Sequence, residues 1–151
     1  MSTRVPELTD HLGYWLRQVS NHVSHGFARK LADKDVTVAE WGLLRMLYER
    51  KPCAPSQLAQ EMSLTRGAVT KLADRLIAKG LIIREASAED GRAQTLRLTA
   101  KGARFAPALA ALADKNEIEC FAHLSAADRR ALKRILSETV ARLGLTKMPL
   151  D

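Results

Sequence analysis

The 151 residues are 46% hydrophobic and carry 24 Lys or Arg against 17 Asp or Glu, a composition that supports one compact core, but the chain is too short for two independent domains of ordinary size. No apolar run approaches the roughly 20 residues of a membrane-spanning helix, the first ten residues lack the apolar core of a signal peptide, and the two cysteines lie too far apart to indicate a disulfide framework or a thiolate metal site. We therefore predict a cytoplasmic protein with a single domain over residues 1–151, no cofactor, and a net charge of +7 that favours a polyanionic partner.

The first two predicted elements are helices. Apolar residues recur at spacings of three and four from Leu8 to Leu31, the pattern of one helix face. A second helix is predicted to begin after Thr37, because its hydroxyl is placed to accept from the Glu40 amide while the Glu40 carboxylate reaches back in a capping box. Its apolar face carries Trp41, Leu44, Leu47 and Tyr48.

Two short helices follow. Pro55 suits the first position of a helix through Met62, since its missing amide hydrogen would have no partner there in any case, although Ala54 is a poor cap. After a short turn, Thr65 is predicted to cap a fourth helix that Gly80 ends. The apolar face of this fourth helix comprises Val69, Leu72, Ala73, Leu76 and Ile77.

A β-hairpin is predicted next. Residues 81–85 and 95–98 are short β-prone runs separated by a polar loop that contains Asp90 and Gly91. Beyond Thr99 the pattern returns to that of a helix. The predicted fold class is therefore mainly α with a small β-hairpin.

The last part of the chain is predicted to form two helices. Pro107 is expected to kink the first of them or to delay its first turn, because proline lacks an amide hydrogen. Ser125 with Asp128 opens the second, which is expected to end near Gly144.

The positive charge is concentrated in the middle of the chain. Residues 51–104 hold ten Lys or Arg against five Asp or Glu, whereas residues 1–50 and residues 105–151 each hold seven against six. If the middle segment reads nucleic acid, the flanking segments are expected to build a scaffold or a dimer interface.

Residues 56–80 read as two short helices joined by a tight turn, which indicates a helix-turn-helix. In such units the second helix enters the major groove, which alone is wide enough for a helix and distinguishes all four base pairs. Arg66, Thr70 and Lys71 lie nearest the helix start, where base edges are reached, and Arg75 is expected to meet phosphate. The alternative is a solvated helix face. The outward positions are Arg66, Gly67, Thr70, Lys71, Asp74 and Arg75.

The predicted hairpin is a candidate wing. Arg92 lies at the expected tip of the ribbon, and Arg suits a narrow minor groove, where the negative potential is strongest. A carboxylate at Asp90 would repel DNA phosphates, so its presence is explained if it pairs with Arg92 or Arg84 and holds the loop in shape. The alternative is an ordinary Asp-Gly turn beside a surface arginine.

At this point the chain resembles the MarR family of bacterial winged helix-turn-helix transcriptional regulators. The matching features are the run TRGAVTKLADRLIAKGLI at 65–82, Arg84, the D-x-R element at 90–92, and LTAKG at 98–102. The resemblance implies a DNA-binding lobe over 37–100, dimerisation helices at 1–36 and 101–151, and a homodimer whose two wings grip a pseudo-palindromic operator in double-stranded DNA. The implied DNA-binding residues are Thr65, Arg66, Gly67, Thr70, Lys71, Arg75, Arg84, Asp90 and Arg92.

Dimerisation also follows from the physics of recognition. One recognition helix covers only a few base pairs, so specific binding recruits a second half-site one helical turn away. The terminal helices supply apolar surface for an interface, the alternative being that this surface completes the core of the monomer. The residues are Leu8, Leu12, Leu132, Leu136, Leu143, Leu145 and Leu150.

The resemblance also implies a repressor of its own or neighbouring genes that a small phenolic or aromatic carboxylate releases. Such ligands enter a crevice between the dimer helices and the DNA-binding lobe, where aromatic rings stack on the ligand and Arg17 or Arg45 pairs with its carboxylate. The alternative is that the tryptophans are core residues. The candidate ligand-binding residues are Trp15, Arg17, His22, Trp41 and Arg45.

Regulation by oxidants or by zinc is the other possibility that the resemblance raises. Cys53 lies in a predicted loop after Lys51, but similar peroxide sensors carry a cysteine early in the first helix and this chain has none, so Cys53 is interpreted as incidental and Cys120 as buried. His22 and His25 lack a nearby Cys or carboxylate cluster, so no metal site is predicted.

The sequence contains no phosphate loop, dinucleotide fingerprint, zinc-protease helix or serine elbow, so no catalytic residues and no enzymatic activity are predicted. The alternative functions are a non-specific or architectural nucleic-acid binder and a winged-helix protein-interaction module.

Overall fold

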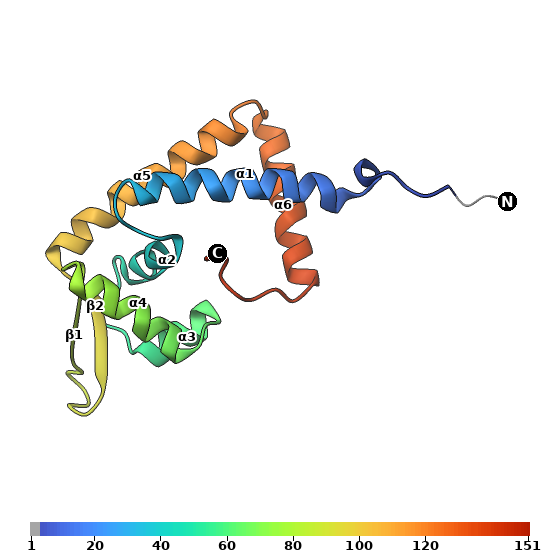
Figure 1. Ribbon diagram of the computed structural model, residues 1–151. Helices are drawn as coiled ribbons and strands as arrows, with labels where there is room; N and C mark the ends of the chain where they lie inside the picture. Colours follow the sequence, from blue (N-terminus) through green and yellow to red (C-terminus); the bar gives the residue numbers. More distant parts are fainter. Residues whose placement is uncertain (1–3) are drawn as a thin grey trace.

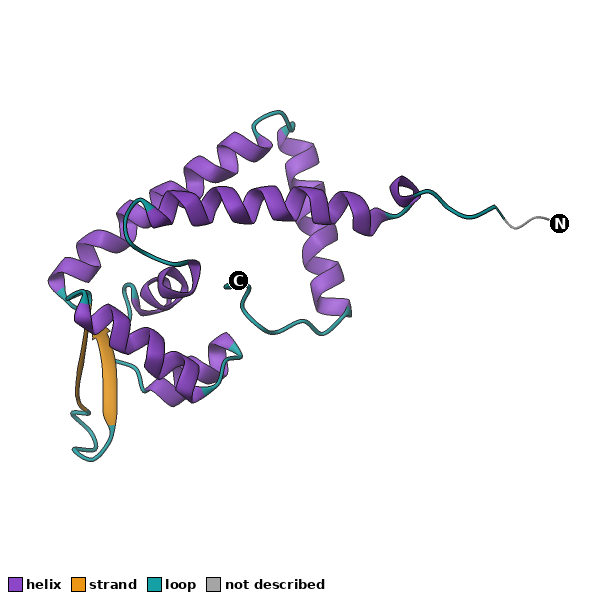
Figure 2. Cartoon of the chain, viewed as in Figure 1, coloured by secondary structure: helices purple, strands orange, loops and turns teal. Residues whose placement is uncertain are grey.

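The computed structural model describes residues 4–151 (Figures 1 and 2). A short 3₁₀ turn precedes six α-helices and a two-stranded antiparallel sheet. The elements are η1 (Leu8–Asp10), α1 (Leu12–Ala32), α2 (Val38–Leu47), α3 (Pro55–Met62), α4 (Arg66–Ala78), β1 (Ile82–Ala86), β2 (Gln94–Leu98), α5 (Ala100–Phe121) and α6 (Ala126–Arg142).

The elements form two groups (Figure 1). Helices α2, α3 and α4 pack together, and the β1–β2 hairpin projects from this lobe. Helices α1 and α5 pack along one another, and α6 follows α5 at the side of the molecule away from the hairpin. The chain then returns from α6 so that its last residues lie beside α2.

Local capping confirms most of the predicted helix starts. Thr37, Thr65 and Ser125 each accept a hydrogen bond from the amide three residues ahead, at 3.1 Å in all three cases. Pro55 begins α3 as expected, and Ala54 makes no side-chain cap there. Gly80 adopts a left-handed φ of 73° just past α4, a conformation that favours glycine. The order of elements was therefore predictable from local signals.

Three local predictions were wrong. The helix expected over 8–31 is broken at His11, whose backbone is extended; the indole of Trp15 donates to the carbonyl of Thr9 (3.0 Å) across this break. The delayed start that Pro107 was expected to cause in α5 does not occur, because the helix begins at Ala100, where the hydroxyl of Thr99 accepts from the Gly102 amide (3.0 Å). Pro107 lies inside the helix, and a kink there stays a prediction. The hairpin strands are shifted slightly from the predicted runs, to 82–86 and 94–98.

The core lies within the helix-turn-helix lobe and reaches the hairpin. Fully buried side chains come mainly from α2, α3 and α4, with one each from α1, β2 and α5. Helix α6, all of which the structure describes, contains no buried residue. Within residues 4–151, no helix is both long and apolar enough to span a membrane. The core residues with the largest fully buried side chains are Leu31, Leu43, Leu44, Leu58, Met62, Val69, Leu76, Leu96 and Leu109.

Candidate nucleic-acid interface

Helix α4 presents a basic outer face. Its inward positions are buried as predicted (Val69, Leu72, Ala73 and Leu76), although Ile77 is only partly buried. Arg66, Lys71 and Arg75 are exposed, and among residues 4–151 no hydrogen bond or ion pair involves their side chains. Three cations on one helix therefore remain free to meet an anionic partner.

The smaller residues of this face have local roles. Thr65 is exposed, but its hydroxyl is engaged as the cap of α4. Thr70 donates its hydroxyl to the carbonyl of Arg66 (3.0 Å), which leaves the oxygen free only as an acceptor. A Cβ at Gly67 would meet nothing within 4 Å, so this position leaves open space beside the helix backbone.

An ion pair joins the recognition helix to the hairpin. Arg84 and Leu96 are paired across the sheet, and because Leu96 is buried, Arg84 lies on the sheet face that looks toward the helices. Its guanidinium contacts the carboxylate of Asp74 at 2.7 Å. Asp74 is outward-facing as predicted, but its partnership with Arg84 was not expected, and it excludes Arg84 as the partner of Asp90.

The tip of the hairpin is ordered by its own backbone. The carboxylate of Asp90 accepts from the backbone amide of Arg92 (3.1 Å), and the amides of Ser87 and Ala93 are also bonded within the turn. The expectation that Asp90 pairs with an arginine side chain was therefore wrong, because an Asx-type turn satisfies the carboxylate first. Within residues 4–151 the exposed guanidinium of Arg92 has no hydrogen-bond or ion-pair partner.

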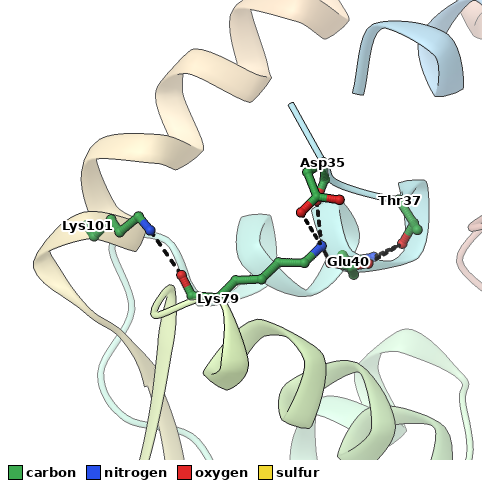
Figure 3. Close-up of polar contacts among 5 residues, drawn as sticks. All are labelled: Asp35, Thr37, Glu40, Lys79 and Lys101. Carbon is green, nitrogen blue, oxygen red and sulfur yellow. Dashed lines mark hydrogen bonds and ion pairs between the residues drawn. The ribbon is translucent and has the colours of Figure 1, made fainter. Parts of the chain in front are cut away.

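Lys79 anchors the end of the recognition helix (Figure 3). It caps the C-terminus of α4, and its ammonium group contacts the Glu40 carboxylate (2.7 Å) and the Asp35 carbonyl (2.5 Å). Glu40 is only 3% exposed, and its second oxygen accepts from the Thr37 hydroxyl (3.2 Å), so the carboxylate does not close the predicted capping box on the backbone. The buried charge of Glu40 is thus compensated by Lys79, at the end of the helix that carries the exposed cations.

The start of α5 also contacts the C-terminal end of α4. Lys101 donates to the backbone carbonyl of Lys79 (3.1 Å), and the Thr99 hydroxyl donates to that of Gly80 (2.7 Å). At Gly102 a Cβ would collide with the backbone carbonyl oxygen of Leu81. Helix α4 is therefore joined rigidly to α5. Sequence reasoning missed this joint because its hydrogen-bond partners lie 19 and 22 residues apart, beyond any local pattern.

The region before α3 is also tied to the hairpin. Cys53 pairs with Leu96 through two backbone hydrogen bonds (3.0 and 2.8 Å), which buries the thiol. Burial raises the pKa of the Cys53 thiol, and the nearby positive charge of Arg50 only partly offsets this by lowering it. The burial of Cys53 agrees with its interpretation as incidental, whereas the expectation that Cys120 is buried was wrong, since Cys120 is only partly covered. Neither geometry nor pKa favours a reactive thiolate at Cys53.

A cavity of about 410 Å³ lies between α1, α2, α5 and the segment after α6. Trp41 and Arg45 line it, and the ring of Trp41 meets that of Phe27 edge to face at 6.5 Å. The other ligand candidates, Trp15, Arg17 and His22, do not line this cavity. Among residues 4–151 no three His, Cys, Asp or Glu side chains are placed to hold a metal ion.

Two packed helices, the second with a free basic face, followed by a hairpin with a free arginine at its tip, define a winged helix-turn-helix protein. A family model described as the MarR family matches residues 34–93. An HTH-type transcriptional repressor of Mycobacterium tuberculosis is 29% identical over 127 residues, which cover 84% of this chain and 91% of the relative. The chain is similar to MarR-family transcriptional regulators, over residues 34–93 by the family model and over most of its length in the mycobacterial relative.

Two solved structures share the whole architecture. A Staphylococcus aureus MepR–DNA complex has a TM-score of 0.76 and 23% identity, over 87% of this chain and 98% of the other. A Bordetella bronchiseptica BpsR structure, described as a mechanism for regulation of DNA binding by 6-hydroxynicotinic acid, has a TM-score of 0.76 and 20% identity over 90% and 97%. At these identities the likeness establishes the fold.

Proposed function

We propose that this regulator binds a specific double-stranded operator, with α4 in the major groove and the hairpin in the adjacent minor groove. The observation that carries the proposal is the set of free cations: Arg66, Lys71 and Arg75 on α4 and Arg92 at the tip of the hairpin. Arg84 and Asp90 have supporting roles, the first bracing α4 and the second shaping the tip. Gly67 leaves room for close approach of the backbone to DNA, and the role given to Thr65 is to cap the helix.

We further propose a homodimer in which residues 37–100 bind DNA, while 1–36 and 101–151 dimerise; the first three residues lie outside those described. Large apolar side chains on η1, α1, the end of α5, α6 and the residues just after α6 are exposed in the single chain, and a second copy would cover them. They are Leu8, Leu12, Trp15, Leu16, Val19, Ile118, Leu132, Ile135, Leu136, Val140, Leu143 and Leu145.

The cavity beside α2 is the proposed effector site. An aromatic ring fits against Phe27 and Trp41, and Arg45 supplies a cation for a carboxylate. The BpsR structure, whose DNA binding is described as regulated by 6-hydroxynicotinic acid, supports an effector of this class. The proposal is therefore a cytoplasmic repressor, without a catalytic role, that a small aromatic carboxylate releases.

A gel-shift titration tests the proposal. The protein is titrated against the DNA immediately upstream of its own coding region, with excess random duplex present. A discrete shift at nanomolar protein that survives the competitor is expected. A shift that random DNA abolishes, with the same salt dependence for every sequence, would indicate the alternative of a non-specific binder.

The arginine at the tip of the hairpin is expected to contribute to affinity. Replacing Arg92 by Ala should weaken operator binding at least ten-fold at matched salt without changing the unfolding temperature, because the side chain has no partner among residues 4–151. Lys34→Ala is the matched control, since it removes one exposed positive charge from the turn after α1. Equal affinities for wild type and Arg92→Ala would remove the hairpin from DNA recognition.

Arg66 is expected to read sequence. Its replacement by Ala should relax base preference by about 1 to 3 kcal/mol at one position per half-site, measured by competition among operators with single substitutions. Arg75→Ala is the comparison, because a lost phosphate contact weakens all operators equally. A uniform loss in Arg66→Ala as well would assign Arg66 to the phosphate backbone.

A further inference from the structure

The segment after α6 returns to the helix-turn-helix lobe instead of extending into solvent (Figure 1). The amide of Met148 donates to the carbonyl of Met62, the last residue of α3, at 3.2 Å. Met148 and Leu150 are partly buried and pack against the hydrophobic core. Leu150, which we expected in the dimer interface, therefore packs within its own chain, whereas Leu145 is 59% exposed.

The same segment forms one side of the proposed effector cavity. Residues 148–151 line the cavity together with Trp41 and Arg45 of α2. Lys147, Leu150 and Asp151 also line a second cavity, of about 240 Å³, beside Lys71 and Arg75 of α4. Leu150 thus lies between the effector cavity and the recognition helix.

Gly42 permits this approach. A Cβ at Gly42 would lie 2.5 Å from Cδ2 of Leu150, so any larger residue would force that side chain to move. Glycine inside a helix costs about 1 kcal/mol relative to alanine. The packing of Leu150 directly on the backbone of α2 offsets this cost. The position of Leu150 therefore depends on the absence of a side chain at Gly42.

We propose that residues 148–151 are a specificity-determining wall of the effector cavity, with Leu150 setting the size of ligand that is accepted. The inference rests on the effector site in the proposed function. The cavity of about 410 Å³ lies near the lower end of the range for small-molecule sites, and Leu150, packed against Gly42, occupies the space beside α2. With this wall in place we expect the cavity to favour carboxylates with one aromatic ring. Removing the wall opens the cavity to carboxylates with two fused rings.

The test compares benzoate and 2-naphthoate as probes, with Trp41 fluorescence as the readout. The chain has two tryptophans, so all proteins in the test carry Trp15→Phe, which leaves Trp41 as the source of the signal. The full chain is expected to bind benzoate at least ten-fold more tightly than 2-naphthoate. A chain ending at Lys147 and the milder variant Leu150→Ala are expected to lose that preference. Thr146→Ala, an exposed position in the same segment that does not line the cavity, is expected to keep it.

The same benzoate to 2-naphthoate ratio in the full chain and in Leu150→Ala would overturn the proposal, as would failure of both probes to bind any of the proteins. Leu150→Ala keeps the test decisive if the shortened chain does not fold. Gel shifts on the same proteins test DNA recognition separately from the wall of the cavity. A full chain that does not bind the operator would count against DNA recognition, whereas the ratio of the two ligand affinities reports on the wall alone.

Discussion

Among the glycine-to-alanine substitutions, Gly102→Ala is expected to lower the free energy of unfolding the most. The new Cβ would collide with the carbonyl oxygen of Leu81, a buried backbone atom that also accepts from the Thr99 amide (3.0 Å). Side-chain rotation cannot relieve a clash with backbone, so the junction between α4 and α5 must shift. We expect a loss of about 3 kcal/mol, at the upper end of the usual range for overpacking.

Thermal unfolding followed by circular dichroism measures this effect. A loss of about 3 kcal/mol lowers the Tm of a domain of this size by roughly 6 to 12 °C. Gly67→Ala is the matched control, since its Cβ would meet nothing within 4 Å and alanine favours the helix, so its Tm should stay level or rise. If Gly102→Ala melts at the same temperature as Gly67→Ala, the junction is not rigid.

Replacing Lys79 by Met is expected to be the most damaging change of a charged residue. It leaves the carboxylate of Glu40, 3% exposed, without its cation, and also breaks the hydrogen bond to the Asp35 carbonyl. Breaking a buried ion pair from one side costs about 3 to 5 kcal/mol, and because the Lys79 side chain is 28% exposed we expect about 2 to 3 kcal/mol. Chemical denaturation measures the free energy of unfolding.

Two variants make the experiment specific. Lys101→Met removes only the hydrogen bond to the Lys79 carbonyl, so its expected loss is about 1 kcal/mol. Glu40→Leu combined with Lys79→Met removes both charges and should recover much of the lost stability. Additive losses in the double variant would show that the two side chains do not act as a pair.

The sequence predicted most of the helix starts because each depends on residues only a few positions apart. Thr65 accepts from an amide three residues ahead, and the proline that starts α3 is restricted by its own ring. The buried face of α4 followed from apolar spacing alone. Such signals survive without any knowledge of the tertiary fold.

The polar contacts between elements were not predictable in the same way. Asp74 and Arg84 are ten residues apart across a turn, and Glu40 and Lys79 are 39 apart, so no periodic pattern connects them. Cys53 was expected in a loop because nothing local indicates its bridge to Leu96. The placement of free cations on α4 followed from sequence, whereas the groups that hold the helix in position required the structure.

The rigid junction at the end of α4 makes α5 a lever arm. Helix α5 has 22 residues and is roughly 33 Å long, since each residue adds about 1.5 Å. A tilt of about 6° at its far end, where the dimer contacts are proposed, displaces the junction by about 3.5 Å, close to the roughly 3.4 Å rise of one base pair. Because Lys79, Lys101 and Gly102 tie α4 to α5, we expect a small rotation of α5 to displace α4 as a unit by about the rise of one base pair.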